Sequence, residues 1–330
     1  MRVFVTGATG FVGGHLVRVL LQKGISVRAL VRDRNKADQL ESMGVETVMG
    51  DTTDRSSFKG ALKGCEVVYH LGNIASWWLP DKGLYYRVNV DGTKNVMFEA
   101  LEEGVRKVIY TSSLAAIRQP RGEITTEETK HKGDFESHYG RSKFLAEREI
   151  LRIYRQYGLP VVILNPGVVI GPGDLKTFGR TVIDFLNGRL KAIPCKDSVV
   201  PIVYIDDTVE AHIAAVDKGK VGERYILVGD NIRIGDLFRM LSEITGVAVP
   251  RKTVSATTLK LIAYLLETVS FFTGKPPKLA VDGVRAMEIG AAGCSKKAKE
   301  ELGISFTPVE EALRKTVEWY RLNGYINRFS

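Results

Sequence analysis

The sequence predicts an α/β protein that has a doubly wound parallel sheet and a smaller C-terminal α/β lobe. The first half alternates short β-branched runs with stretches whose apolar residues recur at helical spacing. A glycine-rich turn joins the first expected strand to the first expected helix. This order of strand, helix and strand is typical of a parallel sheet with helices on both faces. The second half loses the rhythm, which indicates a smaller lobe over the carboxyl edge of the sheet.

The expected strands of the first half are short and rich in β-branched residues. They are Arg2–Thr6, Ser26–Val31, Glu46–Met49, Glu66–His70, Lys107–Tyr110 and Val161–Leu164. Helices fit between them, at Phe11–Lys23, Val90–Glu103 and Ser142–Tyr157. The first helix has Val12, Leu16, Val19 and Leu20 at the spacing of a buried stripe, and Gly24 ends it.

The second half contains fewer expected strands, and they lie among helices. The strands are Val199–Ile205 and Tyr225–Val228, and the helices are Asp207–Asp217, Ile234–Thr245 and Pro308–Asn323. The changeover lies near Pro166. We therefore expect a first domain over residues 1–165 and a second lobe over residues 166–330, with segments of the lobe returning to the first domain. No repeat or low-complexity linker separates them, so they should pack as one unit.

Composition excludes several classes of protein. Hydrophobic residues make up 44% of the 330 residues and charged residues 26%, which is typical of a globular chain. The net charge is +9, but the basic residues are scattered, whereas a nucleic-acid binder concentrates them in a stripe. The three cysteines form no disulfide framework, no metal-ligand spacing is present, and no secretory signal or long apolar span is visible. We expect a cytoplasmic protein without a metal and without a nucleic-acid partner.

The turn after the first strand is a candidate phosphate-binding loop, Thr6-Gly7-Ala8-Thr9-Gly10-Phe11-Val12-Gly13. Its glycines permit a sharp turn, close approach of a pyrophosphate and packing of the helix on the sheet. Free N–H groups and the helix dipole favour an anion at the start of the helix. We expect the dinucleotide to contact Gly7, Thr9, Gly10, Phe11, Val12 and Gly13. The alternative is a tight turn with no ligand.

The end of the second strand distinguishes NAD from NADP. An acidic residue there binds the ribose 2′-hydroxyl of NAD, whereas an arginine accommodates the 2′-phosphate of NADP. Arg32, supported by Arg34 or Lys36, therefore favours NADP over NAD, although Asp33 follows directly. The alternative is a solvated basic loop.

The third strand leads to Asp51 and Thr52, which we expect near the adenine. The Asp51 carboxylate could accept a hydrogen bond from the adenine amino group. An Asx turn is the alternative role for Asp51, and Asp54 is better placed to cap a helix.

A tyrosine and a lysine four residues apart form the candidate catalytic pair. Tyr139 and Lys143 lie one above the other on a helix face. A cation one turn away should lower the pKa of the phenol from about 10 and make Tyr139 a general acid/base. The fifth strand ends in Ser112 and Ser113 at the carboxyl edge of the sheet, where ligands bind. The alternatives are a surface pair for the tyrosine and lysine, and a helix cap for a serine.

These motifs together resemble the extended short-chain dehydrogenase/reductases of the NAD-dependent epimerase/dehydratase family. The resemblance covers essentially the whole chain and is strongest to the dihydroflavonol-4-reductase-like branch, which includes 3β-hydroxysteroid-dehydrogenase-like proteins. Several motifs occur in the order and at the spacing that are typical of the family. They are TGxxGxxG, the Thr-Ser-Ser strand end, YxxxK, Asn165–Gly173, and Val203–Asp207 with Ala211-His212. The second strand, Val27–Asp33, resembles the NADP type of this branch.

The resemblance implies a Rossmann NADP-binding domain over residues 1–165 and a substrate-binding lobe over residues 166–330. It implies that Ser113 orients the substrate carbonyl, with Ser112 as the fallback, and that Tyr139 exchanges the proton. Lys143 would lower the pKa of the tyrosine and bind the nicotinamide ribose. The remaining cofactor contacts implied are Leu71, Gly72 and Asn73 on the adenosine side, and Pro166, Val168 and Val169 at the nicotinamide. A homodimer is also implied, through the helices that carry Tyr139 and Val90–Glu103.

The resemblance predicts an NADP(H)-dependent oxidoreductase that interconverts a ketone and a secondary alcohol on an apolar small molecule. The first alternative is a nucleotide-sugar epimerase or dehydratase with tightly held NAD, which shares the serine, tyrosine and lysine. The basic second strand argues against it. The second alternative is a dinucleotide-binding protein without catalysis.

An apolar substrate is suggested by Trp77-Trp78 and by the segment Ala256–Phe272. The tryptophans could wall the substrate pocket or pack under the second lobe. The segment could be a core helix, a substrate entrance, or a weak membrane-surface contact with nearby lysines facing anionic headgroups. Those lysines are Lys252, Lys260, Lys275 and Lys278.

Overall fold

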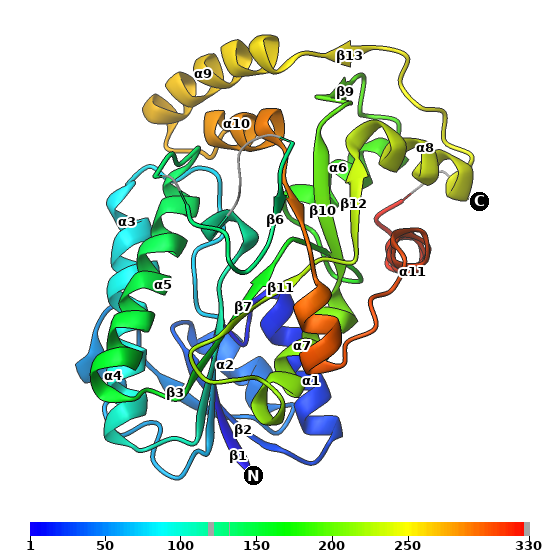
Figure 1. Ribbon diagram of the computed structural model, residues 1–330. Helices are drawn as coiled ribbons and strands as arrows, with labels where there is room; N and C mark the ends of the chain where they lie inside the picture. Colours follow the sequence, from blue (N-terminus) through cyan, green and yellow to red (C-terminus); the bar gives the residue numbers. More distant parts are fainter. Residues whose placement is uncertain (118–121, 132, 327–330) are drawn as a thin grey trace.

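The computed structural model describes residues 1–117, 122–131 and 133–326 (Figure 1). Its main sheet contains β1 (Arg2–Thr6), β2 (Ser26–Val31), β3 (Glu46–Met49), β4 (Val67–His70), β5 (Lys107–Thr111), β7 (Val161–Pro166) and β11 (Arg224–Leu227). These seven strands run in the order β11-β7-β5-β4-β1-β2-β3, and every pairing is parallel. The predicted doubly wound sheet is confirmed.

Helices cover both faces of this sheet. One face carries α1 (Phe11–Gln22), α2 (Arg34–Glu41) and α7 (Ile205–Asp217), and the other carries α4 (Thr93–Glu102) and α5 (His138–Tyr157). The alternation along β1 accounts for the two layers, because Val3 and Val5 join the core under α1 while Phe4 joins the core under α5. The main sheet is therefore buried on both sides, as its nearly continuous apolar strands require.

The strand order reverses between β1 and β4, and this position determines where a ligand can bind. In doubly wound sheets, ligands lie beyond the carboxyl ends of the strands at such a switch point. Thr6 at the end of β1 is in register with His70 at the end of β4. The glycine loop and the segment that begins at Leu71 therefore leave the sheet at the same edge.

Two elements from the second half of the chain belong to the layers of the main sheet. Strand β11 pairs in parallel with β7 and extends the sheet, and helix α7 packs against α1. Sequence periodicity placed both among the helices of the second half, because pairing between distant strands leaves no local signal. Both elements come from residues 166–330 and lie in the layers of the main sheet, and the division into two domains stays a prediction.

The remaining strands and helices build the smaller lobe and the connections. The strands are β6 (Ile124–Thr125), β8 (Val168–Ile170), β9 (Ile193–Pro194), β10 (Val199–Tyr204), β12 (Asp230–Arg233), β13 (Thr253–Val254) and β14 (Ala292–Gly293). They form a β12-β10-β8 sheet and the pairs β13-β9 and β14-β6. The helices are α3 (Gly83–Tyr86), α6 (Thr177–Leu186), α8 (Ile234–Thr245), α9 (Ala256–Thr273), α10 (Val281–Ile289) and α11 (Val309–Leu322). Figure 1 shows α9 and α10 stacked at the end of the molecule opposite the N-terminus.

Short helical turns complete the described part of the chain, and one changes a predicted helix. They are the 3₁₀ turns η1 (Arg55–Phe58) and η3 (Leu114–Ala116) and the π turns η2 (Arg87–Gly92) and η4 (Ala298–Leu302). The helix expected at Val90–Glu103 is therefore η2 followed by α4. Helix α5 begins at His138 rather than Ser142, because the Ser137 hydroxyl caps it by accepting from the Gly140 N–H at 3.0 Å.

Candidate active site

The glycine loop lies tightly against the end of β4. Gly7 has a φ of +76°, and a Cβ there would come within 2.7 Å of the backbone of Leu71 and Gly72. A Cβ at Gly13 would lie 2.1 Å from the Gly7 carbonyl oxygen, so α1 can begin this close to the loop only with glycine. Gly10 caps α1 without a side-chain hydrogen bond. The N-terminal N–H groups of α1 are thus left for an anion.

The other loop residues predicted to bind the cofactor surround this helix end. Thr9 and Gly10 are exposed, and Phe11 and Val12 are half-buried in the first turn of α1. A Cβ at Gly72 would lie 2.8 Å from the Thr6 hydroxyl oxygen, and the Gly72 N–H donates to that oxygen at 3.0 Å. The segment after β4 is therefore held against the loop by backbone contacts.

Asn73 provides a test of whether these residues fit a dinucleotide. Both polar atoms of its side chain are buried, and neither has a hydrogen-bond partner among the described residues. Leaving a buried polar group unpaired costs about 1–3 kcal/mol, which a bound ligand can recover. A glycine cradle, an uncapped helix N-terminus and an unpaired amide beside them fit the dinucleotide that the fold implies.

At the end of β2, the Arg32 side chain is exposed to solvent, whereas the carboxylate of its neighbour Asp33 caps a helix. The Arg32 side chain is 70% exposed and its Nη1 lies 3.3 Å from Asp51 Oδ2. The Asp33 carboxylate caps α2, because its Oδ1 accepts from the Lys36 N–H at 3.3 Å. Arg34 does not support Arg32 as we expected, since its guanidinium pairs with Asp38 and Glu41 along α2. The exposed side chain of Lys36 lies on the first turn of α2.

Asp51 forms the Asx turn that the sequence left open as an alternative. Its Oδ1 accepts from the N–H and the hydroxyl of Thr53, both at 2.9 Å. Burial raises the pKa of Asp51, but the hydrogen bonds from Thr53 and the charge of Arg32 outweigh it and hold the pKa below its ordinary value. Asp54 caps η1, as expected. Thr52 is buried, with its carbonyl oxygen accepting from Asn95.

Tyr139, Ser113 and Lys143 converge at the carboxyl end of β5. The Ser113 side chain hydrogen-bonds the Tyr139 side chain. Ser113 Oγ also accepts from the Ala115 N–H at 3.2 Å, so the serine caps η3 as well. Lys143 is 2% exposed, and its Nζ donates to the Thr111 carbonyl oxygen at 2.7 Å. The end of β5, the start of η3 and the first two turns of α5 thus place the three side chains at the same edge of the sheet.

The expected effect of Lys143 on the tyrosine differs from what the structure shows. We expected the cation to lower the pKa of Tyr139, but burial raises it, and the Ser113 hydrogen bond only partly opposes that rise. Burial also lowers the pKa of Lys143 to about 7, although the nearby carboxylate of Glu147 opposes this change. Burial thus disfavours the charged form of Lys143 as well as that of Tyr139.

Glu147 lies one turn beyond Lys143 and is also buried. Its carboxylate accepts from Asn165 Nδ2 at 2.6 Å and pairs with Arg224 at 3.1 Å. Asn165 Nδ2 also donates to the Ser113 carbonyl oxygen at 3.0 Å. This amide therefore links the carboxylate beside Lys143 to the backbone of the candidate serine.

Sequence reasoning missed a buried chain of hydrogen bonds that reaches Lys143 from the glycine loop. His70 is fully buried, with Nδ1 at 2.6 Å from the Thr6 hydroxyl oxygen and Nε2 at 2.9 Å from the Thr93 hydroxyl oxygen. Thr93 hydrogen-bonds Tyr110, and Lys143 Nζ lies 3.4 Å from the Tyr110 hydroxyl. Burial lowers the pKa of His70 to about 3, so the imidazole is neutral. A histidine that ends a buried strand beside a strand-ending threonine is the signal that could have revealed the chain.

The fallback serine and the predicted nicotinamide residues lie at the same edge of the sheet. The Ser112 N–H donates to the Leu164 carbonyl oxygen at 2.7 Å, whereas its hydroxyl is buried without a partner among the described residues. Ser112 therefore lies inside the sheet layer. Pro166 ends β7, beside β5, and Val168 and Val169 are half-buried at the start of β8.

Trp77 lies between the candidate tyrosine and the smaller lobe. Its ring meets the Tyr139 ring edge-on, with 5.8 Å between the centroids. A Cβ at Gly283 would lie 3.2 Å from Trp77, so α10 packs directly on the indole. Trp77 thus packs under the smaller lobe, one of the two roles that the sequence left open, and a wall for the substrate stays a prediction. His138, the first residue of α5, is half-buried and stacks on Tyr85.

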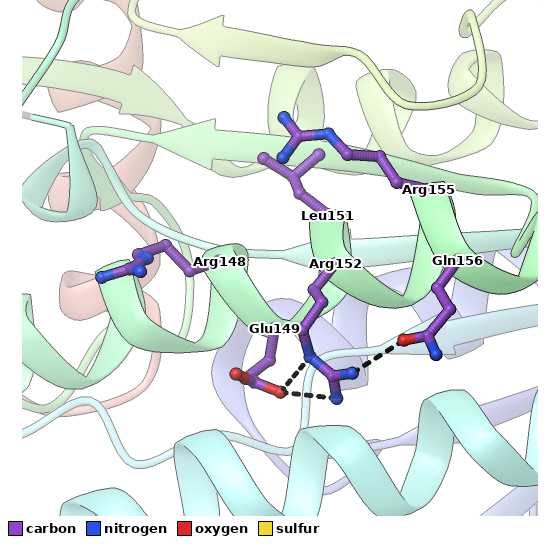
Figure 2. A pocket seen from close by; sticks show the side chains of 6 residues that line it. All are labelled: Arg148, Glu149, Leu151, Arg152, Arg155 and Gln156. Atoms are coloured by element: carbon purple, nitrogen blue, oxygen red, sulfur yellow. Dashed lines mark hydrogen bonds and ion pairs between the residues drawn. The ribbon is translucent and has the colours of Figure 1, made fainter.

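A surface pocket elsewhere on α5 is unrelated to this site (Figure 2). It lies on the last turns of the helix, about 20 Å from Tyr139 at 1.5 Å per residue. Its lining residues are Arg148, Glu149, Leu151, Arg152, Arg155 and Gln156. Figure 2 shows the Arg152 guanidinium held between Glu149 and Gln156. This pocket is formed by α5, which is one of the two helices that we expect at a dimer interface. The homodimer itself stays a prediction.

No group of three or more histidine, cysteine, aspartate or glutamate side chains in residues 1–117, 122–131 and 133–326 is placed to hold a metal ion. Within the same part of the chain, no helix combines the length and the apolar character needed to cross a bilayer.

Comparison with known proteins identifies the family. Residues 3–229 match the NAD dependent epimerase/dehydratase family. The chain is 35% identical to the sterol demethylase protein B of Methylococcus capsulatus, over 99% of this chain and 100% of that protein. It is 34% identical to a putative dihydroflavonol 4-reductase of Synechocystis, over 98% of this chain and 95% of that protein.

A solved structure shares the fold over the same extent. The crystal structure of a nucleoside-diphosphate-sugar epimerase from Pseudomonas aeruginosa superposes with a TM-score of 0.79, at 25% identity and over 99% of both chains. The glycine cradle at the switch point, the match over residues 3–229 and the full-length relatives agree, and the chain belongs to the NAD dependent epimerase/dehydratase family, the extended short-chain dehydrogenase/reductases.

Proposed function

We propose that this enzyme is an NADP(H)-dependent oxidoreductase that interconverts a ketone and a secondary alcohol on an apolar small molecule. The convergence of Ser113, Tyr139 and Lys143 beside the glycine cradle carries the proposal. Bound NADP(H) would supply or accept the hydride. Ser113 would hold the substrate oxygen, and the Tyr139 hydroxyl would give it a proton or take one from it.

The position of each side chain supports the role proposed for it. Ser113 and Tyr139 are hydrogen-bonded to each other, so one substrate oxygen placed between them can contact both. Lys143 is anchored on the Thr111 carbonyl oxygen, which keeps its Nζ near the carboxyl edge of the sheet. Because burial lowers the pKa of Lys143 to about 7, its ammonium can lose a proton and the amine can regain one near physiological pH without a large cost.

The preference for NADP is supported by the charge at the end of β2. Arg32 is exposed and directed to Asp51 rather than into the core, and the Asp33 carboxylate is occupied as a helix cap. A 2′-phosphate in this region would meet a guanidinium instead of a free carboxylate.

An apolar substrate is supported by the surroundings of Tyr139. The Trp77 indole contacts its ring, and α10 also packs on that indole. Both the sterol demethylase protein B and the putative dihydroflavonol 4-reductase are named for polycyclic compounds. We infer that a ring system lies along Trp77 with its oxygen at Ser113 and Tyr139.

Cofactor titration followed by a substrate screen tests this proposal. Quenching of tryptophan fluorescence should give a lower Kd for NADPH than for NADH, and ketone reduction should then be screened with the preferred cofactor. Tyr139→Phe should abolish most turnover while NADPH still binds. Equal turnover of wild type and Tyr139→Phe on every active ketone would refute the proposed catalytic role.

The alternative function is that of a nucleotide-sugar epimerase or dehydratase. It is considered because the similar P. aeruginosa structure is a nucleoside-diphosphate-sugar epimerase. Such an enzyme would hold NAD tightly through the reaction and would not exchange it with solution. Purified protein that carries stoichiometric NAD, epimerises a nucleotide sugar and shows no preference for NADPH would favour the rival.

A further inference from the structure

Helix α9 turns an apolar face to the outside of the molecule. Of its 18 residues, only Ala263 and Ser270 are buried. The large apolar side chains left exposed are Leu261, Ile262, Tyr264, Leu265, Val269, Phe271 and Phe272. The exposed fraction is 65% for Leu265 and 81% for each of the two phenylalanines. An exposed apolar patch of this kind is typical of a surface that binds a protein partner or a membrane.

The charged residues of α9 are directed inward, which is the reverse of an ordinary surface helix. Lys260 pairs with Glu288 of α10 at 3.0 Å. Glu267 accepts from the Val281 N–H, at the start of α10, at 2.8 Å. The outward face of α9 is consequently made of aliphatic, aromatic and hydroxyl side chains, without a charge from the helix itself.

Basic residues stand at both ends of this face. Arg251 and Lys252 precede α9, Lys275 and Lys278 follow it, and all four side chains are exposed. Around α9, the ion pairs found among the described residues join Lys260 to Glu288 and Arg285 to Asp282. The four flanking cations are thus left unpaired within that part of the chain. An apolar helix face framed by cations is typical of a helix that lies in a membrane interface.

We propose that α9 seats the protein on the surface of an anionic lipid bilayer. The helix would lie in the plane of the interface, since it cannot span the bilayer. Its apolar face would enter the acyl boundary, while Arg251, Lys252, Lys275 and Lys278 would contact anionic headgroups. Figure 1 shows α9 on the outer side of α10, so the docking face is unobstructed by other elements.

A second copy of this chain fits the face less well than a bilayer does. If two α9 helices packed together, either orientation would place basic ends against basic ends, and no acidic residue on the face would compensate. An anionic surface complements the same charges. The bilayer docking does not depend on the proposed reaction, although α10 links the docked face to Trp77 and hence to the candidate site.

Vesicle flotation tests the proposal with the full chain. Wild type should float with vesicles of phosphatidylcholine and phosphatidylglycerol and should remain at the bottom with phosphatidylcholine alone. The double variant F271S/F272S should lower the bound fraction at least about tenfold, because it removes the two most exposed apolar side chains. The double variant K275E/K278E should lower binding to anionic vesicles, as should high salt.

L322S is the matched control, because Leu322 is 72% exposed and lies on α11, away from α9. It should float like wild type. Thermal unfolding at an unchanged Tm would show that the α9 variants are folded. The proposal fails if wild type does not float with anionic vesicles, or if F271S/F272S floats as well as L322S. It also fails if light scattering shows a wild-type dimer that F271S/F272S converts to a monomer, since a second copy would then cover the face.

Discussion

The Nζ of Lys143 lies 2.7 Å from the carbonyl oxygen of Thr111, the last residue of β5. This bond fixes a helix side chain to the edge of the sheet, two residues before Ser113. It also holds the ammonium away from water, and that burial brings its pKa to about 7. The candidate site therefore contains a lysine whose pKa burial lowers towards neutral pH.

Replacement of Lys143 by methionine should separate its catalytic role from its cost to stability. We expect kcat to fall about 100-fold or more, because the proton transfer loses its supporting group. The folded-state pKa is depressed, so wild-type stability should rise as pH increases from about 7 towards 10, where only the unfolded chain binds the proton. Lys143→Met should lack this rise in urea unfolding curves measured at several pH values. An unchanged pH dependence would show that Lys143 does not titrate as described.

Loss of the Ser113 hydroxyl should move the pH dependence of the reaction. The Ser113 hydrogen bond lowers the pKa of Tyr139 against the effect of burial, so Ser113→Ala should raise that pKa further. In alcohol oxidation, Tyr139 must be deprotonated before it can accept the proton of the alcohol. The increase of kcat with pH should therefore occur at higher pH in Ser113→Ala than in wild type. We also expect kcat to fall about 10–100-fold at neutral pH.

Ser112→Ala is the control for that experiment. Its hydroxyl is buried and has no partner among the described residues, so its removal should leave the pH profile of kcat unchanged. Stability should stay level or increase slightly, because an unpaired buried polar group is removed. If Ser112→Ala moves the profile and Ser113→Ala does not, the assignment of the two serines is reversed.

Arg32→Ala should reduce the preference for the phosphorylated cofactor. We expect the Kd of NADPH to rise about tenfold and the Kd of NADH to change little, because one charge-assisted hydrogen bond to the 2′-phosphate is lost. Arg34→Ala is the matched control, since that guanidinium pairs with Asp38 and Glu41 along α2. Fluorescence titrations of both variants with NADPH and with NADH measure these dissociation constants. Equal weakening of NADPH and NADH binding by Arg32→Ala would argue against recognition of the 2′-phosphate.

The parts of the fold that sequence predicted well depend on local patterns. The strands β1, β2 and β3 and the helix α8 have the predicted bounds, because periodicity and glycine or β-branched residues identify them within a short window. The membership of β11 in the main sheet and the contacts of α7 arise from residues far apart in the chain, which periodicity cannot report.

The candidate site shows the same division between local and distant information. The spacing of Tyr139 and Lys143 and the glycine loop are local motifs, and the structure brings them to one edge of the sheet. The electrostatics could not be predicted in the same way. Burial beside Tyr110 and the end of β5 lowers the pKa of Lys143 despite the nearby carboxylate of Glu147, and spacing alone carries no information on burial.

Replacement of His70 by glutamine should make the protein less sensitive to acid. The imidazole is buried and neutral with a pKa of about 3, whereas an unfolded chain protonates histidine near 6.5. The folded-state pKa is depressed, so stability is lost as pH falls from about 6.5 towards 4, where the unfolded state binds the proton and the folded state does not. His70→Gln should flatten this loss, although two altered hydrogen bonds should lower stability at neutral pH by about 1–3 kcal/mol.

Thr93→Val, which removes a hydrogen bond to the same imidazole without removing the titrating group, should lower stability but keep the wild-type slope. Urea unfolding at several pH values checks both variants, and parallel slopes for wild type and His70→Gln would show that His70 does not govern the acid response.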